Sequence, residues 1–254
     1  MCGIIGYVGD EQAAGILMDG LRRLEYRGYD SAGVAVLDGG RLNIVRAVGK
    51  LQNLQKALRA TPLTGTIGVG HTRWATHGKP TETNAHPHTE GRATVVHNGI
   101  IENYATLKER LEKSGATFRS ETDTEVIAHL IDRELRDGRD LPDAVRAALA
   151  ELRGSYAVVV LDSADPDRLV VAKASSPLVL GVADGETFVA SDIPALLGYT
   201  DEFVYLDDGE VAVLSREGYE VTTLDGTPVA KRTQRIRWSP AMAQKGGYKH
   251  FMLK

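Results

Sequence analysis

The most constraining feature of the sequence is its second residue, which is the only cysteine and begins an apolar run interrupted by glycine. The run CGIIGYVG at residues 2–9 predicts a buried strand that starts at the chain end. A small second residue generally permits removal of the initiator methionine, so Cys2 would carry both a thiol and a free α-amine. Their ordinary pKa values are about 8.5 and about 7.7–8.0, so the amine can take the thiol's proton. The pattern therefore predicts a nucleophile that contains its own base and is held rigidly by a strand.

The alternative for Cys2 is a structural role, because free cysteines are among the most buried residues and usually act as small hydrophobic side chains. A single cysteine excludes an intrachain disulfide framework and a thiolate zinc cluster. The net charge of −4 gives no reason to expect nucleic acid or an anionic membrane surface as a partner. We find neither a signal peptide nor an apolar stretch of the ~18 residues that a membrane span needs, so we expect a cytoplasmic protein.

Hydrophobic spacing predicts strands towards both ends of the chain and helices in its middle. A helix capped by Asp10 is predicted up to Leu24, and further helices at residues 50–59, 103–113, 123–136 and 140–152. Strands are predicted at 32–37, 42–45, 65–71 and 93–96, and more short runs follow between residues 156 and 222. This order favours two sheets covered by helices, in layers. The long polar stretch that follows His71 and extends to Arg92 lacks periodicity, which is typical of a functional or disordered loop.

The first pattern that carries chemistry is HTRWATHG at residues 71–78, continued by NAHPH at 84–88. Arg73 can grip a carboxylate with its planar guanidinium, and Trp74 offers a large flat cover. The alternative is that the histidines of this region bind a metal ion, although their irregular spacing is unlike that of a zinc site.

The second pattern is VVHNGII at residues 95–101, where a predicted strand ends at Asn98-Gly99 and a new element starts. The side-chain amide of Asn98 and the backbone N–H of Gly99 could converge on one developing oxyanion. The alternative is a plain Asn-Gly turn.

The third pattern is SETDTE at residues 120–125, which opens a predicted helix. Asp123 could accept a hydrogen bond from a ligand ammonium, whereas the alternative is that Thr122 or Asp123 caps the helix. The polar loop at residues 25–31 is either functional or a connector. Together the patterns supply a nucleophile with its base, an oxyanion hole, a carboxylate clamp and an ammonium acceptor. An α-amino acid with a side-chain acyl group matches that inventory.

Six ordered motifs resemble those of the class II glutamine amidotransferases, which are N-terminal-nucleophile hydrolases. They are CGIIG (2–6), LEYRGYDSAG (24–33), HTRWATHG (71–78), NAHPH (84–88), HNGIIEN (97–103) and SETDTE (120–125). The motifs are most similar to the branch of that family that transfers the amide nitrogen of glutamine to fructose 6-phosphate. The resemblance runs from Cys2 to about Asp192 and more loosely to the end. It implies an α+β fold, a four-layer α/β/β/α sandwich of the N-terminal-nucleophile hydrolase type.

The resemblance also implies roles for individual residues. Cys2 would attack the side-chain amide of glutamine, and Asn98 and Gly99 would form the oxyanion hole. The implied substrate-binding residues are Arg73 for the α-carboxylate, Thr76 and His77 beside it, Asp123 for the α-amine, Trp74 in the lid and ammonia path, Arg27 and Gly28 around the nucleophile, and His86 in support of the loop. No cofactor and no metal ion is implied.

The resemblance divides the chain into a glutaminase domain at residues 1–240 and a linker at 241–254 that leads into a missing sugar-isomerase portion. The Gly246-Gly247 pair fits a linker. Fructose 6-phosphate would bind only through the missing portion of the same polypeptide, so we expect this chain to lack sugar amination. The full-length enzyme would be a homodimer.

Two other interpretations stay open. The chain could belong to another class II amidotransferase, one that delivers ammonia to phosphoribosyl pyrophosphate or to aspartate, although the motif at residues 120–125 favours the sugar enzyme. It could also be a non-catalytic domain of the same fold, an interpretation against which the presence of Cys2 argues.

Overall fold

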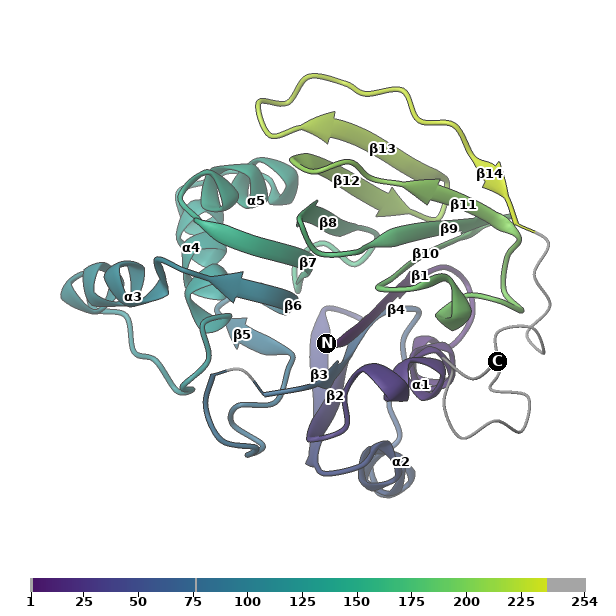
Figure 1. Cartoon of the computed structure of the whole chain (residues 1–254), viewed down its shortest axis with the longest axis horizontal. Helices are drawn as coiled ribbons and strands as arrows, with labels where there is room; N and C mark the ends of the chain where they lie inside the picture. The colour runs from purple at the N-terminus through teal and green to yellow at the C-terminus, as the bar shows by residue number, and fades with distance from the viewer. Residues whose placement is uncertain (1, 76, 237–254) are drawn as a thin grey trace.

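The structure is a computed structural model that describes residues 2–75 and 77–236. Thr76 and the predicted linker at 241–254 lie outside the described residues. In the described part, β-strands form two antiparallel sheets (Figure 1). The eight-stranded sheet has the order β14-β11-β9-β10-β1-β4-β2-β3, and the six-stranded sheet has the order β13-β12-β8-β7-β6-β5.

The strands of the eight-stranded sheet are β1 (Gly3–Val8), β2 (Ser31–Asp38), β3 (Arg41–Val48), β4 (Ile67–Arg73), β9 (Val179–Ala183), β10 (Glu186–Ala190), β11 (Glu202–Tyr205) and β14 (Gln234–Arg235). Those of the six-stranded sheet are β5 (His88–Glu90), β6 (Ala93–Ile101), β7 (Gly154–Asp162), β8 (Leu169–Ala174), β12 (Glu210–Ser215) and β13 (Gly218–Thr223). The helices are α1 (Ala13–Leu24), α2 (Leu51–Ala60), α3 (Tyr104–Lys113), α4 (Glu125–Arg136) and α5 (Leu141–Ala150), with short 3-10 turns η1 (Glu25–Arg27) and η2 (Ile193–Ala195).

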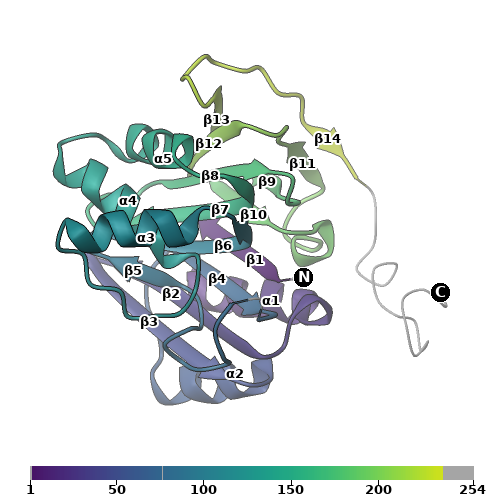
Figure 2. The ribbon, with the colours of Figure 1, turned by 60° about the vertical axis from the view of Figure 1, so that its left-hand side comes forward.

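Three apolar cores stack these elements into four layers. Successive side chains of a strand point to opposite faces, so β1 contributes to two cores at once. Ile5 packs in a core with α1 and α2, whereas Ile4 packs in the core between the two sheets. A third core joins the outer face of the six-stranded sheet to α3, α4 and α5 (Figure 2). The expected α/β/β/α sandwich is confirmed.

The strand that starts at the predicted nucleophile lies at the centre of its sheet. β1 pairs with β10 on one side and with β4 on the other, with Gly3 opposite Thr72 and Ile4 opposite His71. Cys2 therefore precedes a buried strand, as the sequence predicts, and the structure adds that this strand has neighbours on both sides. None of the described helices is long and apolar enough to cross a membrane.

Two local expectations are wrong. α1 begins at Ala13 after Gln12, and Asp10 does not cap it but pairs with Arg216 at 3.0 Å. The strand predicted at 93–96 does not end in an Asn-Gly turn, because β6 continues to Ile101 and stays paired with β7 throughout. The ladder of inter-strand hydrogen bonds outweighs the local turn preference of Asn-Gly.

Candidate active site

A cavity of about 440 Å³ opens beside Cys2 between the two sheets. Most of the residues that the sequence singles out line it: Cys2, Arg27, Arg73, Trp74, His77, His86, Asn98, Gly99 and Asp123. Gly28 is not among its lining residues, and it lies instead against the backbone of Arg73, where a Cβ atom would come within 2.8 Å of the Arg73 carbonyl. The structure thus brings together residues separated by more than a hundred positions in the sequence.

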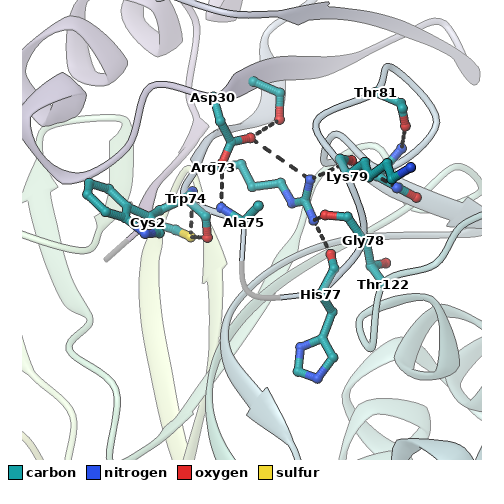
Figure 3. Close-up of polar contacts among 12 residues, drawn as sticks. Cys2, Asp30, Arg73, Trp74, Ala75, His77, Gly78, Lys79, Thr81 and Thr122 are labelled. Atoms are coloured by element: carbon teal, nitrogen blue, oxygen red, sulfur yellow. Dashed lines mark hydrogen bonds and ion pairs between the residues drawn. The ribbon is translucent and has the colours of Figure 1, made fainter.

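The thiol of Cys2 contacts the backbone of Trp74 (Figure 3). The Trp74 N–H donates to Cys2 Sγ at 3.1 Å, and the Trp74 carbonyl oxygen lies 3.5 Å from the same sulfur. Burial raises the pKa of the Cys2 thiol, and the Trp74 hydrogen bond opposes this only in part. A thiol with a raised pKa is mostly protonated at neutral pH, so nucleophilic attack at this site requires a base.

The side-chain amide of Asn98 reaches Cys2 from the opposite sheet. Asn98 Nδ2 donates to the Cys2 carbonyl oxygen at 3.1 Å and to Ser191 Oγ at 2.9 Å, while Oδ1 lies 2.9 Å from His71 Nε2. The next residue, Gly99, has a φ of +136°, and a Cβ atom there would lie 2.0 Å from the Ser155 carbonyl oxygen. The hydrogen-bonded ladder between β6 and β7 can continue past Asn98 only because residue 99 is glycine.

Arg73 stands at the end of β4, where the following loop folds around its side chain. The guanidinium donates to the carbonyl oxygens of His77, Gly78 and Lys79, and it lies 3.9 Å from Asp30 Oδ1 (Figure 3). Asp30 also accepts from the backbone N–H of Ala75. In this structure the predicted carboxylate clamp is therefore occupied by the carbonyl groups of its own loop.

Asp123 is buried just before α4. Its Oδ2 accepts from the backbone N–H of Ile101 at 2.8 Å, so it joins the end of β6 and does not cap the helix. The alternative that Thr122 or Asp123 caps this helix is wrong, because residue 124 precedes the helix and makes no capping bond with its side chain. The turn before α4 is held instead by Glu125, whose carboxylate accepts from the backbone of Arg119 and Ser120 at 2.8 and 2.7 Å.

The remaining predicted residues lie on the walls of the cavity. Trp74 is half exposed, and its ring meets the ring of Tyr29 edge-on at 5.5 Å. His77 lies against Tyr104 with ring centroids 5.3 Å apart. Arg27 donates to the Cys2 carbonyl oxygen at 3.1 Å and pairs with Asp192 at 3.3 Å.

Sequence reasoning missed Asp30, Ser191 and Asp192 as members of the site. Asp30 lies in the loop at 25–31, and its position next to Arg27 and Gly28 was the available signal. Ser191 and Asp192 follow β10, a strand whose pairing partner is β1. No local pattern marks them, because only the strand pairing brings them to Cys2.

Four buried histidines form a cluster beside the cavity, which two of them, His86 and His97, also line: His71, His86, His88 and His97. The rings of His71 and His86 lie 4.0 Å apart, and those of His86 and His88 lie 4.7 Å apart. Thr124 Oγ1 lies 2.9 Å from a ring nitrogen of both His86 and His97. Burial lowers the pKa of all four rings. The pKa falls to about 3 for His71 and His88, and it falls well below its ordinary value for His86.

The alternative that the histidines of residues 71–88 bind a metal finds no matching geometry. Within residues 2–75 and 77–236, no three His, Cys, Asp or Glu side chains converge as ligands of an ion would. The ring of His77 packs edge-on against Tyr104 and makes no ring contact with the cluster among the described residues. The cluster rings serve as neutral hydrogen-bonding groups in the interior.

The buried histidines predict a loss of stability in mild acid. Their folded-state pKa values lie below the unfolded value of about 6.5, so the unfolded chain binds more protons, and stability falls as pH falls from about 6.5 towards 3. Each such histidine contributes a slope of up to about 1.4 kcal/mol per pH unit. We expect the free energy of unfolding, measured with urea, to decrease as the pH is lowered from 6.5 to 5. His88→Gln should reduce the dependence of this free energy on pH by the equivalent of about one bound proton. An equal slope in both proteins would contradict the assignment.

Residues 71–198 match the protein family described as "Glutamine amidotransferase domain". The whole chain is also 54% identical to glutamine–fructose-6-phosphate aminotransferase [isomerizing] of Symbiobacterium thermophilum and 53% identical to the protein of the same name from Pyrococcus horikoshii. The chain spans 42% and 43% of the length of these relatives.

Solved structures share the fold. Glutamine phosphoribosylpyrophosphate amidotransferase from B. subtilis superposes with a TM-score of 0.75 at 28% identity, over 88% of this chain and 49% of that protein. A class-II glutamine aminotransferase domain protein from Silicibacter pomeroyi superposes with a TM-score of 0.60 at 20% identity, over 88% of this chain and 99% of that protein.

Proposed function

Because the chain belongs to the glutamine amidotransferase domain family, we propose that it hydrolyses the side-chain amide of glutamine with Cys2 as the nucleophile, releasing glutamate and ammonia. One observation carries the assignment. The Cys2 thiol opens into a cavity that also receives the Asn98 amide from the opposite sheet. A nucleophile and a hydrogen-bond donor that approach from two directions are what acyl transfer requires.

The reaction begins with activation of the thiol. After removal of Met1, the α-amine of Cys2 takes the thiol proton, which matters because burial raises the pKa of that thiol. The thiolate adds to the amide carbon of glutamine, and Asn98 Nδ2–H and Gly99 N–H stabilise the oxyanion. The protonated amine then gives its proton to the leaving nitrogen, and ammonia departs. Water, deprotonated by the same amine, hydrolyses the thioester to glutamate.

The α-carboxylate and the α-ammonium of glutamine bind to side chains of opposite charge on the cavity wall. Arg73 binds the α-carboxylate, which replaces the loop carbonyl groups that its guanidinium now contacts. Asp123 binds the α-ammonium through its carboxylate, which β6 holds in place through Ile101. His77 on the cavity wall contacts the α-carboxylate end of the substrate, and the family resemblance assigns Thr76 to that end as well. Trp74 covers it as the lid.

The residues behind the substrate act by support. Arg27 binds the Cys2 carbonyl oxygen, and the close packing of Gly28 on Arg73 joins the two loops beside the nucleophile. His86 hydrogen-bonds to Thr124, next to Asp123 in the sequence, and so supports the ammonium site.

The acceptor of the ammonia lies on the part of the polypeptide that the chain does not contain. Residues 1–240 form the glutaminase domain, and residues 241–254 lead into a sugar-isomerase portion that binds fructose 6-phosphate. The supporting observation is the 54% identity to a relative named for this sugar, against 28% to the phosphoribosylpyrophosphate enzyme. The full-length protein, a homodimer, thus makes glucosamine 6-phosphate.

The acceptor assignment is tested with the full-length polypeptide. Supplied with glutamine and fructose 6-phosphate, it should form glucosamine 6-phosphate, detected by mass spectrometry, because the sugar site and the glutaminase site are then present together. The chain of 254 residues should release ammonia but form no amino sugar. Nitrogen transfer by the full-length protein to phosphoribosyl pyrophosphate or aspartate instead would contradict it.

The nucleophile is tested by substitution of Cys2. Cys2→Ala should abolish glutamate release, and Cys2→Ser should lower it steeply, because a hydroxyl ionises far less readily than a thiol. The assay is glutamate formation, with circular dichroism as the control for folding. Intact mass spectrometry of the parent should show that Met1 is removed. Activity of Cys2→Ala within tenfold of the parent, or an active chain that keeps Met1, would end the assignment.

The proposed roles of Arg73 and Asp123 lead to a substrate-specific prediction. Arg73→Ala and Asp123→Asn should each raise KM for glutamine, because loss of one partner of a buried charge pair typically costs about 2–5 kcal/mol. Arg73→Ala should also lose the preference for glutamine over its α-amide, and Asp123→Asn the preference over the analogue without an α-amine.

The measurement is kcat/KM for glutamine and both analogues with each protein. Each variant is the control for the other, since Arg73→Ala should still discriminate against the analogue without an α-amine. A parent that hydrolyses both analogues as well as glutamine would remove both residues from substrate reading.

A further inference from the structure

A hydrogen bond between the two sheets holds the Asn98 amide beside the nucleophile. Asn98 belongs to β6 of the six-stranded sheet, whereas Cys2 precedes β1 of the eight-stranded sheet. His71 lies on β4, directly opposite Ile4 of β1, and its Nε2 is 2.9 Å from Asn98 Oδ1. His71 is not among the described residues that line the cavity, so it does not meet the substrate. It connects the strand next to the nucleophile with the predicted oxyanion donor.

The neighbouring acceptors determine which way the amide faces. The carbonyl oxygen of Cys2 can only accept, so the Asn98 atom 3.1 Å away must be the nitrogen, and the atom that faces His71 must be the oxygen. The His97 carbonyl oxygen lies 3.2 Å from the same His71 Nε2 and also only accepts. Two independent acceptors therefore require a proton on His71 Nε2.

The opposite nitrogen of the ring is consistent with this tautomer. His71 Nδ1 is fully buried and has no hydrogen-bond partner in the described part of the chain. An N–H there would be a buried donor without an acceptor, which is more costly than an unpaired lone pair on a neutral ring. Burial lowers the pKa of His71 to about 3, so the ring carries a single proton at neutral pH.

We propose that His71 is a positioning residue for the glutaminase reaction. The His71 Nε2–H group donates to Asn98 Oδ1 and so keeps the Nδ2 end of the Asn98 amide directed towards Cys2. This inference rests on the proposed function. If the amide turned over, Oδ1 would face the site of the developing negative charge, and an oxyanion donor would become a repulsive acceptor. His71 thus acts on the rate through Asn98 alone.

Two substitutions differ in whether they keep the donor. Glutamine places its side-chain N–H₂ at about the reach of histidine Nε2, whereas asparagine reaches only as far as Nδ1. Loss of one oxyanion donor costs on the order of 10²–10³ in rate, so a donor that is present but misoriented should cost about 10–100-fold. We expect His71→Asn to lower kcat by that factor with KM within about threefold, and His71→Gln to restore kcat to within about fivefold of the parent.

A double-mutant cycle separates positioning from general damage. In an Asn98→Ala background there is no amide to orient, so His71→Asn should change kcat by less than about threefold. The matched control is His88→Asn, which removes another buried histidine of the cluster that bonds to Thr122 rather than to Asn98. Its effect on kcat should be the same in both backgrounds. Equal losses from His71→Asn in both backgrounds, or no loss in either, would overturn the proposal.

A second measurement needs no folded His71→Asn protein. The parent chain labelled with ¹⁵N-histidine should show His71 as the tautomer protonated at Nε2, with its signals identified by their absence from His71→Gln. A proton on Nδ1 would overturn the proposal. Glutamate release by the parent separates the two hypotheses, since a parent that releases no glutamate refutes the proposed function. An active parent with additive variants refutes only the role of His71.

Discussion

The pairing of β1 on both sides is the constraint on which the site depends. A chain terminus normally frays, but here the strand that follows Cys2 lies between β10 and β4 at the centre of a sheet. The backbone hydrogen bonds of both neighbours hold the thiol at the seam between the sheets. Ser191 after β10 and His71 on β4 reach the Asn98 amide from those same two neighbours. The packing of the two sheets therefore determines how the Cys2 thiol and the Asn98 amide lie relative to each other.

The distribution of charge around the cavity follows from the cost of burying ions. The histidine cluster is neutral, because burial lowers the pKa of its rings. The buried cations are paired or hydrogen-bonded: Arg27 with Asp192, and Arg73 with Asp30 and three loop carbonyl groups. The loop carbonyl groups compensate the charge of Arg73, and in the proposed reaction the substrate carboxylate replaces them. Glutamine binding and loop rearrangement are then one event in the proposed reaction.

Much of the architecture was predictable from hydrophobic periodicity. Strands β1, β2 and β4 and all five described α-helices lie where alternating or helical spacing places them, within two or three residues. Two of the errors share one cause, since Asp123 and the Asn98-Gly99 pair each carry a strong local preference for a cap or a turn that tertiary partners overrode. These partners are the backbone of Ile101 for Asp123 and strand β7 for Asn98-Gly99, whereas α1 begins after Gln12, beyond Asp10. Local propensities are worth about 1 kcal/mol, which a paired strand or a buried hydrogen bond can exceed.

The sequence by itself determined the candidate nucleophile, the family resemblance and the order of most elements, because these reside in residue types and in short-range spacing. Only the tertiary structure decided which atom of Asn98 faces Cys2, that Arg73 is held by its own loop, and that Ser191 and Asp192 belong to the site. These features depend on contacts between residues that lie on different sheets or far apart in the chain, such as His71 with Asn98 and Asn98 with Ser191. The direction of a hydrogen bond is set by its partners in space, and no pattern along the chain records where those partners come to lie.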